Sequence, residues 1–165
     1  MTLALGLIVF IPMVIEAAVA SSHDRSLRAQ GALEPIGDVY QLMKLAYPGG
    51  FLAMMVEAWF RHGQSHPVLP AGIVVFVLAK GLKYWAIATL GNRWTFRVLV
   101  PPGSKRIVEG PYRVLRHPNY VAVIGELAGV AMMANALITG PVATGFFLLL
   151  ILARIRVEER ALAAR

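Results

Sequence analysis

Long apolar runs separated by short polar segments dominate this sequence. Five such runs can be drawn, over residues 3–20, 42–60, 68–90, 120–134 and 141–153. Hydrophobic residues make up 58% of the 165 residues and charged residues only 15%, whereas soluble domains hold roughly 45–50% apolar residues. Because a helix needs about 20 apolar residues to cross a bilayer, we predict an all-α integral membrane protein with about five transmembrane helices.

The apolar runs predict a single membrane domain that spans residues 1–165. In chain order it would hold three transmembrane helices (1–90), a cytoplasmic loop (91–119), and a helical hairpin with a C-terminal helix (120–165). Both hairpin runs are short, so we expect them to borrow length from flanking residues and to turn near Asn135 to Pro141. The first run is read as a membrane helix and not as a cleaved signal, because Glu16 interrupts it and no Lys or Arg precedes it.

The polar segments differ sharply in their basic residues. Segment 21–41 holds two Arg, segment 91–119 holds six Lys or Arg, and the tail after residue 153 holds four Arg. The connections that alternate with these segments contain almost no Lys or Arg. The positive-inside rule therefore predicts that the N-terminus is outside and that the three basic segments, with the C-terminus, are cytoplasmic.

Composition narrows the function classes. The absence of Cys removes disulfides, thiolate metal sites and cysteine nucleophiles, and we predict no metal site. The net charge of +7 could suggest nucleic acid. However, the basic residues lie between apolar runs, so anionic lipid headgroups and topology explain them more simply, and we predict no nucleic-acid partner.

The segment 91–119 is the strongest candidate for chemistry. Two extended arms, 95–100 and 106–108, flank the turn at residues 101–103 and could pair as a small hairpin. Arg113 and Arg116 are three apart and would share a face on a helical turn.

The segment ends in a compact group of polar side chains at the mouth of a membrane helix. His117, Pro118, Asn119 and Tyr120 follow Arg116 directly. The basic residues alone would be explained as a headgroup anchor, but an anchor needs neither the imidazole nor the three residues after it. We therefore interpret this group as part of a site.

The tail offers a second group of charges. Arg154 and Glu158 are four residues apart and would pair if the last helix continues into the cytoplasm. Glu158 and Glu159 could hold a cationic or hydroxyl-rich ligand, while the plainer interpretation is a surface ion pair worth about 0–1 kcal/mol.

Four charges fall inside apolar runs, where an unpaired charge costs at least about 2.5–3.5 kcal/mol. Lys80 and Lys83 approach the cytoplasmic end of their run, so snorkelling is the favoured explanation. Glu16 and Glu57 lie near the ends of theirs and are interpreted as structural. Gly125, Ala128 and Gly129 could form a small-residue contact between helices, with the oligomeric state left open.

The ordered set of these motifs resembles a known family. Gly110-Pro111-Tyr112-Arg113, residues 116–120, a hydrophobic hairpin and Glu158-Glu159 are similar to the signature of the isoprenylcysteine carboxyl methyltransferase family of integral membrane enzymes. In finer detail the sequence looks most like short bacterial members that O-methylate alkylpyrones and related long-chain polyketides. The likeness implies a bacterial inner membrane, an S-adenosylmethionine cofactor with S-adenosylhomocysteine as product, and a lipophilic acceptor taken from the bilayer.

The resemblance also implies a role for each matched residue. The cofactor-binding residues would be Arg116, His117, Pro118, Asn119, Tyr120, Glu158 and Glu159, with Pro118 shaping the entrance. Arg154 would face the reacting oxygen of the substrate, and His117 could act as a base for a weakly acidic phenol. Only six residues follow Glu159, so the longer aromatic tail common in the family is missing.

Two other functions fit parts of the pattern. Membrane sterol reductases that use NADPH also carry an Asn-Tyr element after a basic loop, and Gly125-Glu126 faintly resembles them. A small multidrug exporter would use a glutamate in the first helix, here Glu16, but it needs no thirty-residue polar loop. The sequence does not identify the methyl acceptor, because one fold hosts many substrates.

Overall fold

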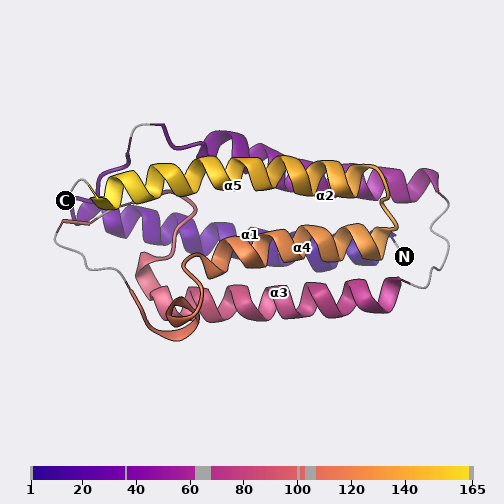
Figure 1. Cartoon of the computed structure of the whole chain (residues 1–165), viewed down its shortest axis with the longest axis horizontal. Helices are drawn as coiled ribbons and strands as arrows, with labels where there is room; N and C mark the ends of the chain where they lie inside the picture. The colour runs from indigo at the N-terminus through magenta and orange to yellow at the C-terminus, as the bar shows by residue number, and fades with distance from the viewer. Residues whose placement is uncertain (1, 36, 62–67, 100, 103–106, 164–165) are drawn as a thin grey trace.

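The structure, a computed structural model, describes residues 2–35, 37–61, 68–99, 101–102 and 107–163. Its α-helices are α1 (Thr2–Ala29), α2 (Tyr40–Phe60), α3 (Leu69–Leu90), α4 (Pro118–Ala134) and α5 (Thr139–Ala163) (Figure 1). Two short 3₁₀ helices, η1 (Gly91–Arg93) and η2 (Gly110–Arg113), lie between α3 and α4. The described part of the chain contains no strand, so the all-α prediction is confirmed. The β-hairpin predicted from residues 95–100 and 106–108 is wrong for residues 95–99, 107 and 108, the part of these arms that the structure describes, because none of them forms a strand.

The helices alternate in direction along the long axis of the molecule, and the two termini lie at opposite ends (Figure 1). The connection from α1 to α2, the connection from α3 to α4, and the end of α5 gather at the end where the C-terminus lies. We call this the polar end, and it is formed by the described residues within 21–41, 91–119 and 154–163. The three basic segments of the sequence therefore meet at one end of the bundle.

Within the described residues, three helices are long and apolar enough to cross a membrane, over Leu3–Ala29, Leu69–Arg93 and Thr139–Arg160. Large apolar side chains on these helices face outward, such as Leu7, Leu78 and Leu149, each more than 60% exposed. Lipid is the environment that makes such surfaces favourable. The chain is an integral membrane protein.

The last helix is longer than the apolar run predicted. α5 continues without a break from Thr139 through the charged tail, so the second hairpin arm and the C-terminal helix are one element of 25 residues. The turn before it lies where it was predicted. Asn135 caps the end of α4 in the left-handed conformation, with φ 51°.

α4 is the central helix and packs against α2, α3 and α5. It approaches α3 closely because two of its residues lack side chains. A Cβ on Gly125 would lie 2.8 Å from the Cβ of Ala79, and one on Gly129 would lie 2.8 Å from the backbone nitrogen of Phe76. The small-residue contact inferred from the sequence thus joins two helices of the same chain.

We expect Gly129→Ala to lower the free energy of unfolding in detergent by about 1–3 kcal/mol, because the added methyl group overpacks against backbone atoms of α3. Gly81→Ala is the matched control on α3, since a Cβ there meets nothing within 4 Å. It should be neutral or stabilising by up to about 1 kcal/mol. Thermal unfolding followed by tryptophan fluorescence measures both, and equal midpoints would contradict the close contact.

The snorkelling prediction for the two lysines of α3 is wrong. Lys80 and Lys83 are 9% and 2% exposed, and both point inward to form ion pairs with Glu16 of α1 and Glu126 of α4. These ion pairs could not be inferred from the sequence, because the partners lie on different helices. The ion pairs offset the desolvation cost of burying the two ammonium groups, a cost that snorkelling to the membrane surface would have avoided.

The structural interpretation of Glu57 is confirmed. Its carboxylate accepts hydrogen bonds from the backbone nitrogens of Ile138 and Thr139 and from the Thr139 hydroxyl, at 3.2, 2.7 and 2.6 Å. These donors belong to the first turn of α5 and the residue before it, where backbone N–H groups have no partner within the helix. Glu57 therefore fixes the start of α5 against the end of α2.

Candidate active site

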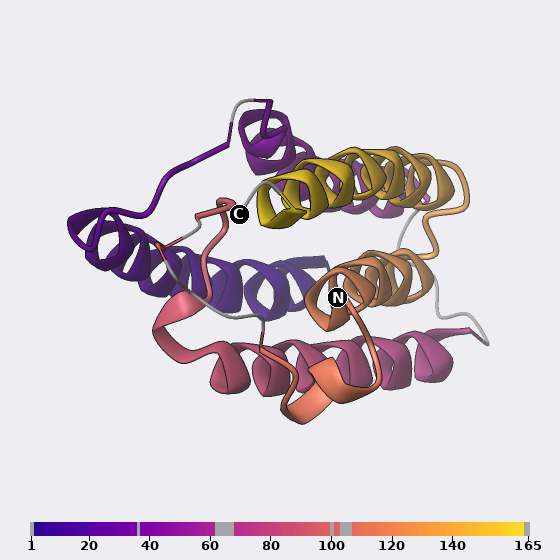
Figure 2. The ribbon, with the colours of Figure 1, turned by 60° about the vertical axis from the view of Figure 1, so that its left-hand side comes forward.

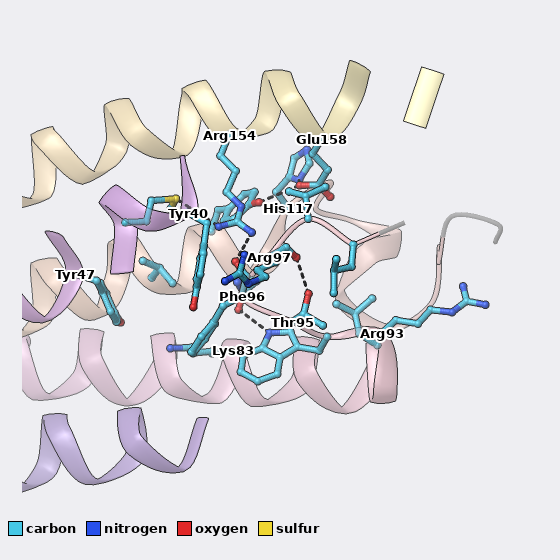
Figure 3. A pocket seen from close by; sticks show the side chains of 18 of the residues that line it. Tyr40, Tyr47, Lys83, Arg93, Thr95, Phe96, Arg97, His117, Arg154 and Glu158 are labelled. Carbon is cyan, nitrogen blue, oxygen red and sulfur yellow. Dashed lines mark hydrogen bonds and ion pairs between the residues drawn. The ribbon is translucent and has the colours of Figure 1, made fainter. Parts of the chain in front are cut away.

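A cavity of about 520 Å³ opens at the polar end of the bundle (Figure 3). Its volume lies within the range of roughly 300–1,000 Å³ found for small-molecule sites. One part of its wall is apolar and is formed by Met13, Val14, Ala17, Pro48, Val123 and Phe147. The other part is polar and includes the charged ends of α4 and α5, so the cavity is suited to an amphipathic ligand.

The segment after η1 forms one wall of this cavity. Residues 94–98 line it and lie between α1 and the end of α5 (Figure 2). Asp38 accepts a hydrogen bond from the backbone nitrogen of Val98 at 3.2 Å, and the guanidinium of Arg97 pairs with Glu34 at 2.8 Å and with Asp24 at 3.5 Å. A polar loop without regular structure is thus fixed by carboxylates from the α1–α2 region.

Trp94 begins this wall and is only 2% exposed. Its backbone oxygen lies 2.8 Å from Nδ1 of His23, and its indole nitrogen donates to Asn119 at 3.5 Å. The structure places this side chain inside the protein. Trp94 therefore joins α1 to the start of α4.

We expect the attachment of this wall to weaken in acid. Burial raises the pKa of Glu34, but hydrogen bonds from Arg28 and Arg97 outweigh that effect and hold the pKa below its ordinary value of 4.5. Because the folded-state pKa is depressed, the stabilisation is complete above pH 4.5 and is lost as the pH falls through the folded pKa. The protection factors of residues 94–98 against hydrogen exchange should fall in that window, whereas in Glu34→Gln they should already be lower at neutral pH and change less there.

The start of α4 presents the residues singled out in the sequence. Pro118 occupies the first helical position, where its missing N–H costs nothing, and it is buried beneath the cavity without lining it. His117 precedes the helix and Tyr120 follows one turn later. Their rings stack with centroids 5.4 Å apart, and both line the cavity.

The end of α5 brings the acidic pair to the same place. Nδ1 of His117 lies 3.8 Å from Glu158, and Nε2 lies 3.9 Å from Glu159. The Tyr120 hydroxyl donates to Glu158 at 3.0 Å. Residues about forty positions apart thus form one cluster, which we call the His117 cluster: His117, Tyr120, Glu158 and Glu159.

Arg154 lies one turn before this cluster and is 6% exposed. Its guanidinium donates to the backbone oxygen of Phe96, lies 3.6 Å from the sulfur of Met43, and is 3.8 Å from Asp38. The ion pair predicted between Arg154 and Glu158 is therefore not formed, because Arg154 turns toward the cavity and the 94–98 wall. Its Nε is buried with no hydrogen-bond partner among the described residues.

The remaining predicted residues divide into two groups. Arg116 and Asn119 line the cavity, with Arg116 exposed and Asn119 held by Trp94. Arg113 is exposed and does not line it, because η2 ends at Arg113 and the two arginines do not share a helical face.

Several lining residues were not assigned to a site from the sequence. They include Tyr40, Tyr47, Lys83, Phe96 and Tyr112. Burial, and next the charge of Glu158, raise the pKa of the Tyr112 phenol, so it stays protonated at neutral pH. The only signal for Tyr112 was its place in the Gly110 to Arg113 motif. No group of three or more His, Asp or Glu suited to a metal ion occurs in the described ranges.

The chain is similar to a known protein family. The isoprenylcysteine carboxyl methyltransferase family matches residues 72–164, more than half of the chain. The uncharacterized protein YpbQ of Bacillus subtilis is 29% identical over 155 residues, which cover 94% of this chain and 92% of that protein.

Two further relatives are more distant or shorter in overlap. An uncharacterized protein of Haemophilus influenzae is 24% identical over 147 residues, covering 88% of this chain and 86% of that protein. The cobalt-zinc-cadmium resistance protein CzcN of Cupriavidus metallidurans is 33% identical over 91 residues, which cover 53% of this chain and 41% of that protein. With the family match spanning η1, η2, α4, α5 and most of α3, this chain belongs to the isoprenylcysteine carboxyl methyltransferase (ICMT) family of membrane methyltransferases.

Proposed function

We propose that this protein uses S-adenosylmethionine to methylate an oxygen atom of a lipophilic acceptor. The observation that carries the proposal is the convergence of His117 with Glu158 and Glu159 at the polar part of a cavity whose other part is apolar. A nucleotide-like cofactor would occupy the polar part. The acceptor would occupy the apolar part.

The residues present fit the cofactor. Nε2 of His117 is buried and has no hydrogen-bond partner among the described residues, so it can bond a ligand. Glu158 and Glu159 retain 30% and 55% of their side-chain exposure, and carboxylates are suitable partners for an ammonium group or ribose hydroxyls. Arg116 and Asn119 border the same space and would bind the remaining polar groups.

The acceptor would approach from the bilayer. Met13, Val14 and Ala17 of α1 form the apolar wall, and Val14 is 67% exposed, so this wall adjoins the lipid-facing surface. Arg154, fixed by Phe96 and Asp38, would orient an anionic oxygen by a charge-assisted hydrogen bond. Suitable acceptors are a carboxylate, an enol such as a long-chain hydroxypyrone, or a phenol.

S-Adenosylmethionine supplies, when bound, a methyl group on a sulfonium that an oxygen nucleophile can displace in line. The protein then mainly has to align the two reactants and exclude water. The wall formed by the buried Trp94 and the half-buried Phe96 would exclude water, and Arg154 would orient the nucleophile. For a phenol that is not ionised at neutral pH, His117 would accept the proton.

Ligand titration of the purified protein tests the proposal. We expect S-adenosylhomocysteine to bind tightly, while NADPH and a lipophilic cation do not. Tight binding of NADPH would favour the sterol-type reductase, and tight binding of the cation would favour an exporter that uses Glu16. Against the exporter, Glu16 is 4% exposed and bound to both Lys80 and Lys83.

Mass spectrometry of membrane extracts addresses the acceptor. Extracts from bacterial cells that contain the protein should hold a lipid heavier by one methylene than its counterpart in cells that lack it. The proposal also includes the orientation predicted by the basic residues, with the polar end in the cytoplasm of a bacterial inner membrane, where soluble cofactor is available.

A further inference from the structure

A cluster of four buried charges lies within the membrane-spanning part of the bundle. Lys80 bonds Glu16 at 2.8 Å and Glu126 at 3.1 Å, and Lys83 bonds the same two carboxylates at 2.5 and 3.2 Å. The four residues come from α1, α3 and α4, and their charges sum to zero. Tyr47 of α2 adds a fifth polar group by donating its hydroxyl hydrogen to Glu126.

Such a cluster is expensive as a purely structural device. Desolvation of each buried ion is costly, and apolar side chains of similar size often replace buried ion pairs without loss of stability. Charged residues inside a membrane protein therefore usually indicate a functional position.

The two lysines differ in one respect. Lys83 and Tyr47 line the cavity, whereas Lys80 does not. Both ammonium groups lie over aromatic rings: that of Lys80 lies 5.8 and 5.7 Å from the ring centres of Phe76 and Tyr84, and that of Lys83 lies 5.5 Å from the ring centre of Tyr47. The cluster is thus open to a ligand at Lys83 and closed at Lys80.

The chemistry of Lys83 defines the ligand. An ammonium has three N–H donors, and Glu16 and Glu126 can each take one, which leaves one for the cavity. An anion would add an uncompensated charge to a neutral cluster in a low-dielectric region. A neutral oxygen, in a hydroxyl or a carbonyl group, matches the donor without that cost.

We propose that Lys83 and Tyr47 form a second polar subsite that binds a neutral oxygen of the methyl acceptor. Figure 3 shows Lys83 coming from α3 and Arg154 coming from α5, on opposite sides of the cavity. The head group of the acceptor would then carry two oxygens, one oriented by Arg154 for methylation and one bonded to Lys83. The inference rests on the proposed function and specifies the substrate class of the same site.

Two lipids that differ in a single hydroxyl group test the subsite. A 5-alkylresorcinol and a 3-alkylphenol with the same chain are titrated calorimetrically into the protein saturated with S-adenosylhomocysteine. We expect the resorcinol to bind roughly tenfold or more tightly, as a hydrogen bond to a charged donor allows. Its two equivalent hydroxyls alone account for a factor of about two.

Matched double variants then assign the preference to Lys83. Lys83→Met with Glu16→Gln, and Lys80→Met with Glu16→Gln, each leave one lysine and one glutamate, so both clusters remain neutral. The Lys83 variant should lose the preference for the resorcinol, and the Lys80 variant should keep it. If both variants keep it or both lose it, the subsite is overturned.

The outcomes separate this inference from the proposed function. Failure of the wild-type protein to bind S-adenosylhomocysteine overturns the proposed function and the subsite with it. Binding of S-adenosylhomocysteine with equal affinity for the two lipids overturns the subsite alone. That second result needs no variant, so the inference stays testable even if the Lys83 variant does not fold.

Discussion

Replacing Glu158 or His117 with alanine is expected to weaken the binding of S-adenosylhomocysteine in detergent roughly tenfold to hundredfold. Glu158 is the centre of the His117 cluster, because it accepts from Tyr120 at 3.0 Å and lies 3.8 Å from His117. Each alanine variant removes a polar contact to the cofactor and one of the two neighbours that hold the other group in place. Hydrogen bonds to charged groups are worth about 1.5–3 kcal/mol each, so affinity should fall roughly tenfold to hundredfold per residue.

Folding should be largely unaffected by these changes. Both side chains lie at the polar end, partly exposed, and outside the apolar core between α2, α4 and α5. Arg113→Ala is the matched control, because Arg113 is an exposed cation of the same loop that does not line the cavity. Calorimetry that finds wild-type affinity in both alanine variants would remove His117 and Glu158 from the cofactor site.

The helices could be predicted from the sequence because the bilayer leaves little choice. Apolar runs near 20 residues must satisfy their backbone groups internally, so each run becomes a helix. The true length of α5 could not be predicted from hydropathy, since the charged residues 154–160 end the apolar run without ending the helix. Most of the residues from 154 to 163 are Ala, Leu, Arg or Glu, which have high helix propensity, so the helix continues past the apolar run.

The convergence of His117 with the acidic pair could be inferred only through the family resemblance. Nothing in spacing alone brings residue 117 to residue 158, because the hairpin between them decides the geometry. The hairpin does so by returning α5 along α4, and Glu57 and Asn135 fix its turn.

The parts of the site that sequence reasoning missed depend on contacts between helices. Lys83 was interpreted as snorkelling because its partner Glu126 lies in another apolar run, forty-three positions away. Asp38 received no role from the sequence. In the structure it lies near Arg154 and accepts hydrogen bonds from the backbone nitrogens of Val98 and of the α2 residue Tyr40.

Arg154→Lys is expected to lower kcat by roughly a hundredfold while S-adenosylhomocysteine binds within about twofold of wild type. Arg154 makes its contacts to Phe96 and Asp38 with a planar guanidinium, and its Nε has no partner among the described residues. A lysine keeps the positive charge that Asp38 requires, but its ammonium is not a planar fork and cannot hold both Phe96 and the acceptor oxygen. Loss of one preorganised donor at a reacting oxygen typically costs roughly 10²–10³ in kcat.

A second variant distinguishes a role of Arg154 in orienting the acceptor from a purely structural role. Arg154→Gln combined with Asp38→Asn removes both charges together, so no unpaired ion is left buried. If Arg154 only fastens the 94–98 wall to α5, this neutral pair should retain most of kcat, because amide hydrogen bonds can replace the contact to Phe96. If Arg154 orients an anionic acceptor, kcat should fall in the neutral pair at least as far as in Arg154→Lys. Wild-type kcat in Arg154→Lys, or a parallel loss of cofactor binding, would contradict the assignment of Arg154 to the acceptor.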